Sequence, residues 1–248
     1  EDKANNLKML EGMISPLKGE TDVVILPEMF STGFSMRPEL LAENIKGETV
    51  RWMKDMAAKL RLILTGSLII EENGKYFNRL VWMLPDGNFG YYDKRHLFGF
   101  AGEDNHYTAG SKRLIASAKG WKINLQVCYD LRFPVWARQG NGSVEPEYDL
   151  LVYVANWPEK RIHAWKTLLQ ARAIENQCYC VGVNRVGEDG NEVYHSGNSM
   201  VVDAMGEVLY TKQDAEDVFT VTLEKETLDS VREKLPFLKD RDGFLISR

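Results

Sequence analysis

Three ionisable residues each follow a strand-like apolar run in this sequence. Glu28 ends "VVILPE", Lys94 ends "FGYYDK" and Cys128 ends "INLQVC". In open α/β sheets, functional side chains collect just past the strand ends, because loops there vary without disturbing the core. In acyl transfer a thiolate attacks, a carboxylate takes and returns its proton, and a cation stabilises the developing negative charge. The three residues are therefore candidates for this chemistry.

Each of the three also has a purely structural interpretation. A lone cysteine is more often a small buried hydrophobic residue than a nucleophile. A glutamate after a proline is commonly a solvated loop carboxylate, and the lysine of "DKRH" fits an exposed charged turn. Residue types and spacing alone leave both interpretations open.

Helical and strand-like patterns alternate along the chain and predict how these residues are positioned. Apolar residues at helical spacing predict helices over residues 3–18, 50–60 and 162–177, and "KETLDSVREKL" predicts a short helix before Pro236. Apolar β-branched runs predict strands at "DVVILP", "LILTGSLII", "DLLVYVAN", "CYCVGVNRV", "SGNSMVVDAMGEVLYT" and "DVFTVTLE". "KYFNRLVWMLPDGNFGYYDK" and "RLIASAKGWKINLQVCYD" predict hairpins. This order predicts an α/β fold with mixed sheets covered by helices.

Composition narrows the class of protein. The 248 residues are 44% hydrophobic and 27% charged, and no linker divides them, so we expect one domain over residues 1–248. A net charge of −5 without a Lys/Arg run argues against a nucleic-acid partner. No apolar run reaches the roughly 18 residues that span a bilayer, so we expect neither a membrane partner nor a signal peptide. The three cysteines cannot form a disulfide framework, which favours a reducing cytoplasm.

Three ordered segments, "LPEMFSTGF", "YDKRHLF" and "CYDLRFP", resemble the signature segments of the nitrilase (carbon–nitrogen hydrolase) superfamily. The likeness continues through "VYVANWP", "HAWKTLLQARAIENQ" and "GNSMVVDAMGEVL", so it covers nearly the whole chain. "PEMFSTGF" and "KRHLF" are most similar to the omega-amidase branch, whose members deamidate 2-oxo acid amides such as 2-oxoglutaramate. The resemblance implies an amidase with a Glu-Lys-Cys triad at Glu28, Lys94 and Cys128.

The resemblance also implies a fold and an assembly. Members of this superfamily form four-layer αββα sandwiches, associate as homodimers and use neither a metal nor an organic cofactor. They usually open with a β-strand before the first helix. Here a helical pattern follows Glu1 at once and no starting methionine is present, so we expect the usual first strand to be absent and leave open that the N-terminus is truncated.

A mechanism follows from the resemblance. Cys128 would attack the amide carbonyl, and Glu28 would carry the proton from the thiol to the departing ammonia. Lys94 and the backbone N–H of Tyr129 would hold the oxyanion, and water would then hydrolyse the thioester. Glu103 in "GFAGEDNHYTAG" matches a second family glutamate that would orient the lysine or the substrate, with the adjacent Asp104 as the alternative.

Substrate recognition is predicted from chemistry. A 2-oxo acid amide carries a carboxylate, which calls for arginine or backbone donors. Arg161 follows the strand that ends at Asn156 and is our candidate, whereas we expect Arg132 to form a structural salt bridge. Three aromatic residues are expected to wall the pocket: Phe34, Phe98 and Trp157.

Other functions remain open at this point. Nitrilases and N-carbamoyl amino acid amidohydrolases use the same three catalytic residues with a differently shaped pocket. A non-catalytic, partner-binding member of the fold is a second alternative. A thiol redox protein using Cys178 and Cys180 is a third, although we expect these to be core thiols, because a metal site there would need two further ligands.

Overall fold

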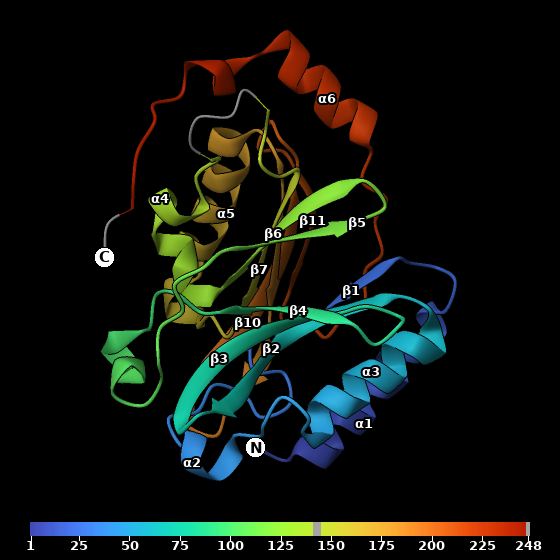
Figure 1. The fold of residues 1–248 in the computed structure, drawn as a ribbon, viewed down its shortest axis with the longest axis vertical. Helices are drawn as coiled ribbons and strands as arrows, with labels where there is room; N and C mark the ends of the chain where they lie inside the picture. The colour runs from blue at the N-terminus through green and yellow to red at the C-terminus, as the bar shows by residue number, and fades with distance from the viewer. Residues whose placement is uncertain (141–144, 247–248) are drawn as a thin grey trace.

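Two sheets pack against each other and helices cover their outer faces in this computed structural model, which describes residues 1–140 and 145–246 (Figure 1). Helices α1 (Lys3–Ile14) and α3 (Glu48–Leu60) pack on the four-stranded sheet. Helix α5 (Ile162–Asn176) packs on the larger sheet. The layer order is therefore the αββα sandwich expected from the resemblance.

The smaller sheet has the strand order β1-β2-β3-β4. Its strands are Val23–Ile25, Ile63–Glu72, Lys75–Met83 and Phe89–Asp93. β1 is parallel to β2, whereas β2–β3 and β3–β4 are antiparallel pairs, so the sheet is mixed. Glu28 lies just past the end of β1, and Lys94 directly follows β4.

The larger sheet has the order β11-β10-β8-β7-β6-β5, and β9 pairs with β10 outside this path. Its strands from β5 to β11 are Leu114–Ala118, Trp121–Val127, Leu150–Ala155, Tyr179–Asn184, Val186–Glu188, Tyr194–Val202 and Val208–Gln213. β6, β7 and β8 are parallel, and the remaining pairs are antiparallel. Cys128 directly follows the parallel strand β6, at the edge where Asn156 follows β7.

Three apolar clusters separate the layers. α1 and α3 bury Leu10 and Met53 against the outer face of the smaller sheet. Leu80 and Val152 belong to the cluster between the two sheets. Trp165 and its neighbours on α5 fill the space outside the larger sheet. Burying both faces of β7 explains why "LLVYVA" is apolar without alternation.

Short helices complete the fold. They are α2 (Pro38–Leu41), α4 (Pro134–Ala137), α6 (Lys225–Lys234) and the 3₁₀ turns Ser15–Leu17, Gly99–Ala101, Glu103–Asn105, Cys128–Arg132, Glu159–Arg161 and Phe237–Asp240. The predicted helix over 3–18 is shorter than expected because Pro16 has no N–H to continue the α-helical pattern. None of the helices in the described part of the chain has the length and apolar character of a membrane span.

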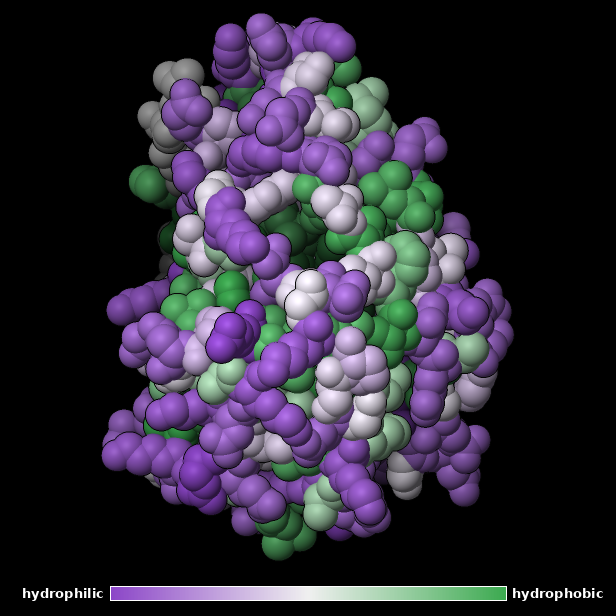
Figure 2. All heavy atoms as spheres, turned by 90° about the vertical axis from the view of Figure 1, so that its right-hand side faces the viewer, coloured by the Kyte–Doolittle hydropathy of each residue, from purple (hydrophilic) through white to green (hydrophobic). Residues whose placement is uncertain are grey.

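The strand predicted at "DVFTVTLE", residues 217–224, is wrong. The segment has no strand assignment and no strand partner among the described residues, and Val218 and Phe219 remain exposed. An apolar alternation forms a strand only where a neighbouring backbone supplies hydrogen bonds. Within the described residues, β2 is the only strand that pairs with β1, and β1 and residues 217–223 line one cavity of about 1940 Å³. A hollow with hydrophobic walls opens on the face that carries β1 (Figure 2).

Candidate active site

Cys128 begins a 3₁₀ turn, Cys128–Arg132, directly after β6. Its φ of 46° lies in the left-handed region, which non-glycine residues rarely occupy and which costs of order 1–3 kcal/mol. Such strain persists where surrounding contacts fix it, and it turns the side chain out of the strand. The half-buried thiol faces the same cavity as Glu28 and Lys94.

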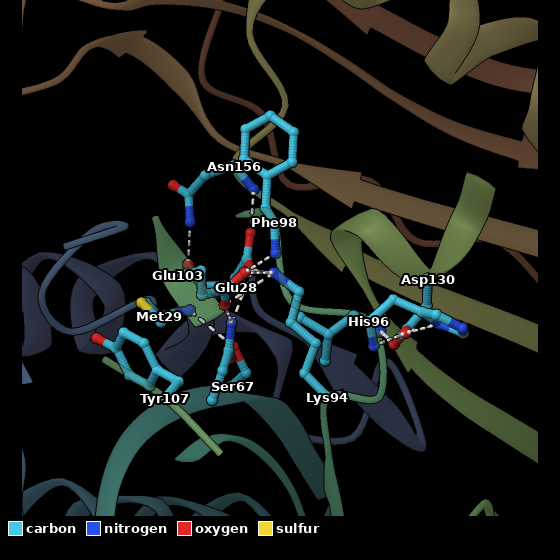
Figure 3. Close-up of polar contacts among 12 residues, drawn as sticks. Glu28, Met29, Ser67, Lys94, His96, Phe98, Glu103, Tyr107, Asp130 and Asn156 are labelled. Atoms are coloured by element: carbon cyan, nitrogen blue, oxygen red, sulfur yellow. Dashed lines mark hydrogen bonds and ion pairs between the residues drawn. The ribbon is translucent and has the colours of Figure 1, made fainter. Parts of the chain in front are cut away.

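Glu28 is 1% exposed and is held by three hydrogen-bond donors (Figure 3). Its Oε1 accepts from Lys94 Nζ at 3.0 Å and from Asn78 Nδ2 at 2.8 Å. Its Oε2 accepts from the backbone N–H of Asn156 at 2.9 Å. The next residue, Met29, has a φ of 45° and donates its N–H to Ser67 Oγ at 2.8 Å. The carboxylate is thus fixed from both sheets.

Lys94 lies between two buried carboxylates. Its Nζ is 3.0 Å from Glu28 Oε1 and 2.8 Å from Glu103 Oε2. Burial by itself would lower the pKa of Lys94, but the charges of Glu103 and Glu28 outweigh it and raise that pKa. The two carboxylates therefore favour the protonated, ammonium form of Lys94.

Glu103 is fully buried and bonds Lys94 with both oxygens, while Asp104 is exposed. Of the two sequence alternatives, the structure brings Glu103 to the lysine. Glu103 Oε2 also accepts the backbone N–H of Phe98 at 2.6 Å, so the carboxylate ties the loop after β4 to the site. Burial raises the pKa of Glu103, and the adjacent Lys94 charge opposes that rise.

The Cys128 thiol is not activated by its surroundings alone. Burial raises its pKa well above the ordinary value, and the Glu28 carboxylate raises it further by charge and by a hydrogen bond, while Lys94 lowers it. Burial and the carboxylate together outweigh the ammonium. The thiol is therefore protonated at neutral pH, and attack on a carbonyl requires a base, for which the adjacent carboxylate is suitably placed.

All three predicted aromatic residues line the cavity with Cys128. The ring centroid of Phe34 is 5.4 Å from Lys94 Nζ, and the ring of Phe98 meets Tyr129 edge to face at 4.9 Å. Trp157 is 3% exposed and donates its indole N–H to the backbone oxygen of Arg161 at 2.9 Å. These rings give the cavity apolar walls around a charged floor.

Arg161 and Arg132 also line this cavity. Arg161 Cζ is 5.2 Å from the ring centroid of Phe98, and burial lowers its pKa while the nearby Cys128 raises it. The predicted salt bridge of Arg132 is wrong: within the described residues it has no acidic partner, and its guanidinium lies 5.0 Å from the Trp157 ring. The face of the Trp157 ring attracts this cation, and the sequence pattern does not show that the two residues meet.

Sequence reasoning missed the residues that hold Glu28. Asn78 donates to Glu28 and, at 3.3 Å, to Glu103 Oε1. Asn156 donates its backbone N–H to the Glu28 side chain and its Nδ2 to the Glu28 backbone oxygen at 2.7 Å. A signal was present for both, because one asparagine interrupts an apolar strand and the other ends one.

The remaining cysteines lie away from this site. Cys178 and Cys180 are free, fully buried and part of the cluster beneath α5, as expected for core thiols. Burial raises the pKa of both thiols, which suppresses redox reactivity. In the described ranges 1–140 and 145–246, no three His, Cys, Asp or Glu side chains are arranged to hold a metal ion.

Comparison with known proteins identifies the family. The carbon–nitrogen hydrolase model matches residues 1–233. The omega-amidase YafV of Yersinia enterocolitica is 42% identical over 248 residues, which cover 99% of this chain and 93% of that protein. The 2-oxoglutaramate amidase of Bacillus subtilis is 30% identical, with 96% and 91% covered.

A solved structure gives the same result. The crystal structure of XC1258 from Xanthomonas campestris, a CN-hydrolase superfamily protein with an arsenic adduct in its active site, superposes with a TM-score of 0.96. It is 45% identical, and the match covers 99% of this chain and 94% of that one. The chain therefore belongs to the carbon–nitrogen hydrolase family, and it is an enzyme of that family.

Proposed function

We propose that this enzyme hydrolyses the terminal amide of small amides that also carry a carboxylate, as an omega-amidase acting on 2-oxoglutaramate or 2-oxosuccinamate. The observation that carries the proposal is a cavity that combines Cys128, Glu28 and Lys94 with the half-buried guanidinium of Arg161. The similar omega-amidase and 2-oxoglutaramate amidase support this choice of substrate.

In the proposed first half-reaction, Cys128 Sγ attacks the amide carbon as its proton passes to Glu28. The negative charge that develops on the carbonyl oxygen is stabilised by Lys94 and by the backbone N–H of Tyr129. Losing one such donor typically costs about 2.7 to 4 kcal/mol of barrier. Glu28 then returns the proton to the leaving nitrogen, the C–N bond breaks, and ammonia departs from a thioester.

In the second half-reaction, the same Glu28 removes a proton from water, which attacks the thioester carbon. The C–S bond breaks, the proton returns to Sγ, and the carboxylic acid product leaves. Lys94 remains protonated throughout, which fits the raised pKa that its two glutamate neighbours give it. Glu103 orients that ammonium. The reaction needs only water as co-substrate.

The proposed carboxylate subsite is centred on Arg161. Within the described residues its side chain forms no salt bridge with an acidic group, and burial lowers its pKa. A partly desolvated guanidinium binds a carboxylate through two parallel hydrogen bonds. Arg132 on the Trp157 face adds positive charge to the same wall, and Phe34 and Phe98 contact the carbon chain.

A panel of substrates tests this function. We expect ammonia release from 2-oxoglutaramate and 2-oxosuccinamate, and none of comparable rate from a nitrile of the same length or an N-carbamoyl amino acid. No release from any dicarboxylic acid monoamide would show that the substrate class is wrong. Faster turnover of the nitrile or the carbamoyl compound would instead support one of those activities.

The variant Cys128→Ala tests the mechanism in the same assay. Removing a catalytic nucleophile typically lowers kcat by about 10⁴-fold or more, and intact-mass analysis should detect an acyl adduct on the wild type that the variant lacks. Unchanged turnover in Cys128→Ala would disprove the thioester mechanism. Absence of both turnover and adduct in the wild type would favour a non-catalytic, partner-binding role.

Two further expectations accompany the proposal. The resemblance predicts a homodimer, which sedimentation equilibrium of the purified protein tests directly. Three free thiols, two of them buried in the core, fit a reducing compartment, so we place the activity in the cytoplasm. Cell fractionation tests that placement.

A further inference from the structure

Asp130 is a fully buried carboxylate two residues after Cys128, and no step of the mechanism above uses it. Asp130 is not one of the described residues that line the cavity, so its side chain does not contact a substrate bound there. A buried carboxylate is costly unless its oxygens are hydrogen-bonded. Its partners therefore show what the charge is for.

Four hydrogen-bond donors surround Asp130 (Figure 3 shows those from His96). Oδ1 accepts from the backbone N–H of His96 at 2.9 Å and from His96 Nδ1 at 2.8 Å. Oδ2 accepts from the Tyr92 hydroxyl at 2.7 Å and from the backbone N–H of Val127 at 3.0 Å. Facing a carboxylate, Nδ1 of His96 carries the proton.

These donors lie on both sides of the reacting groups. Tyr92 precedes Lys94 by two residues, and His96 follows it by two. Val127 is the residue immediately before Cys128. One carboxylate thus joins the end of β4, in the smaller sheet, to the end of β6, in the larger sheet.

We propose that Asp130, with His96 as its partner, is a positioning residue that sets Lys94 against Cys128. Its bond to the Val127 N–H closes the turn in which Cys128 is held at a φ of 46°. Its bonds to His96 and Tyr92 fix the chain on either side of the lysine. The consequence for turnover rests on the proposed role of Lys94 as an oxyanion donor, whereas the geometric consequence does not.

The number of donors explains why the residue is an acid. A carboxylate accepts all four bonds, whereas an asparagine has one accepting oxygen and would turn an NH₂ group toward two donors. Asp130→Asn therefore keeps the shape and breaks one of the two connections. A matched control is Asp149→Asn, because Asp149 is also buried and bonds Lys225, Arg232 and the Lys122 N–H at the starting ends of β6 and β7, opposite the ends that Cys128 and Asn156 follow.

The test compares these variants in three measurements: thermal midpoint, kcat and KM on the best amide substrate, and the pH profile of Cys128 alkylation by iodoacetamide. A misplacement of about 1 Å costs roughly 100-fold in rate, so we expect Asp130→Asn to lower kcat about 100-fold with KM changed less than about threefold. Its alkylation inflection should move to higher pH, because the ammonium that lowers the pKa of the thiol no longer faces it. Asp149→Asn should lower only the thermal midpoint.

His96 provides a second pair of variants in case Asp130→Asn does not fold. The His96 side chain is 24% exposed, so substitutions there are tolerated more easily. His96→Ala removes the Nδ1 donor, whereas His96→Asn places an amide N–H near the same position. We expect His96→Ala to reduce kcat about tenfold or more and His96→Asn to recover most of that loss.

Two results would overturn the proposal. One is that the kcat of Asp130→Asn or His96→Ala falls no further than the kcat of the Asp149→Asn control, when the compared variants have the same thermal midpoint. The other is an unchanged alkylation inflection in both variants. Since alkylation needs no substrate, it decides the positioning role even if no amide on the panel is hydrolysed.

Discussion

The two ends of the cavity are built differently. At the reacting end, Glu28, Lys94 and Glu103 are at most 1% exposed and bonded to one another and to buried amides. At the rim, Phe100 is 88% exposed and the Arg161 guanidinium rests on ring faces. Hydrogen bonds fix the first region in one geometry, whereas ring contacts let the second adjust to a ligand. Changes at the reacting end should therefore act on kcat, and changes at the rim on KM and selectivity.

Among the variants that compare the two regions, the largest effect should come from Glu103→Gln. A glutamine amide keeps the size of the side chain, but one of its ends donates and so opposes the Lys94 ammonium. We expect kcat to fall by about 10²- to 10³-fold, the range seen when one oxyanion donor is lost, with little change in KM. Steady-state kinetics measure this. Asp104→Asn is the matched control, because Asp104 is the next residue in the chain and its side chain is exposed. Equal losses in the two variants would contradict the difference between the two regions.

A smaller and different effect is expected at the rim from Arg161→Met. A hydrogen bond to a charged group contributes about 1.5 to 3 kcal/mol, so KM for 2-oxoglutaramate should rise roughly 10- to 100-fold. An amide without a carboxylate should lose less than about threefold in kcat/KM. Lys166→Met removes one positive charge from an exposed position of α5 and should change neither value. A loss of kcat with unchanged KM would place Arg161 in the reacting end instead.

The smallest effect concerns pH and the Cys128 thiol. Because burial and Glu28 raise its pKa, the protonated form persists above the value near 8.5 of a free thiol, and alkylation should accelerate only beyond it. Glu28→Gln removes a negative charge that raises the pKa of the thiol, so the inflection of the alkylation rate should move to lower pH. At a fixed pH below the inflection, each pH unit of that shift should raise the alkylation rate about tenfold. Iodoacetamide labelling followed by mass analysis measures this, and Cys128→Ala should show no labelling at the site. An inflection that moves upward in Glu28→Gln would contradict the assigned electrostatics.

Much of the reacting end was predictable from sequence, for a local reason. Glu28, Lys94 and Cys128 each lie in a short segment that also contains the strand leading to it, so residue types and position make them candidates, and the three segments in order carry the family resemblance. The sequence signals that Asn78 and Asn156 are unusual, but not that both bind Glu28, because they come from separate strands that meet only through sheet packing. The choice between Glu103 and Asp104 likewise depended on which side chain the loop turns inward.

The errors share a cause. The segment 217–224 has strand-like alternation, but pairing depends on a neighbouring backbone that the pattern does not describe. Arginines commonly form salt bridges, yet the partner of Arg132 is the ring of Trp157. The fold brings the centroid of this ring to 5.0 Å from Arg132 Cζ. Local propensity predicts elements and strand ends, while the partner of an element or a charge is a property of the assembled layers.

The proposed reacting groups come from opposite layers of the sandwich. Glu28 and Lys94 follow strands of the smaller sheet, and Cys128 and Asn156 follow strands of the larger one. Neither sheet alone contains the proposed nucleophile together with its proposed base, so a fragment that preserves only one sheet would lack one of the two. Contacts between the layers, such as the bond from Asn156 to Glu28, both join the two sheets and hold the proposed base in place. The catalytic rate should therefore report how accurately the smaller sheet packs on the larger sheet.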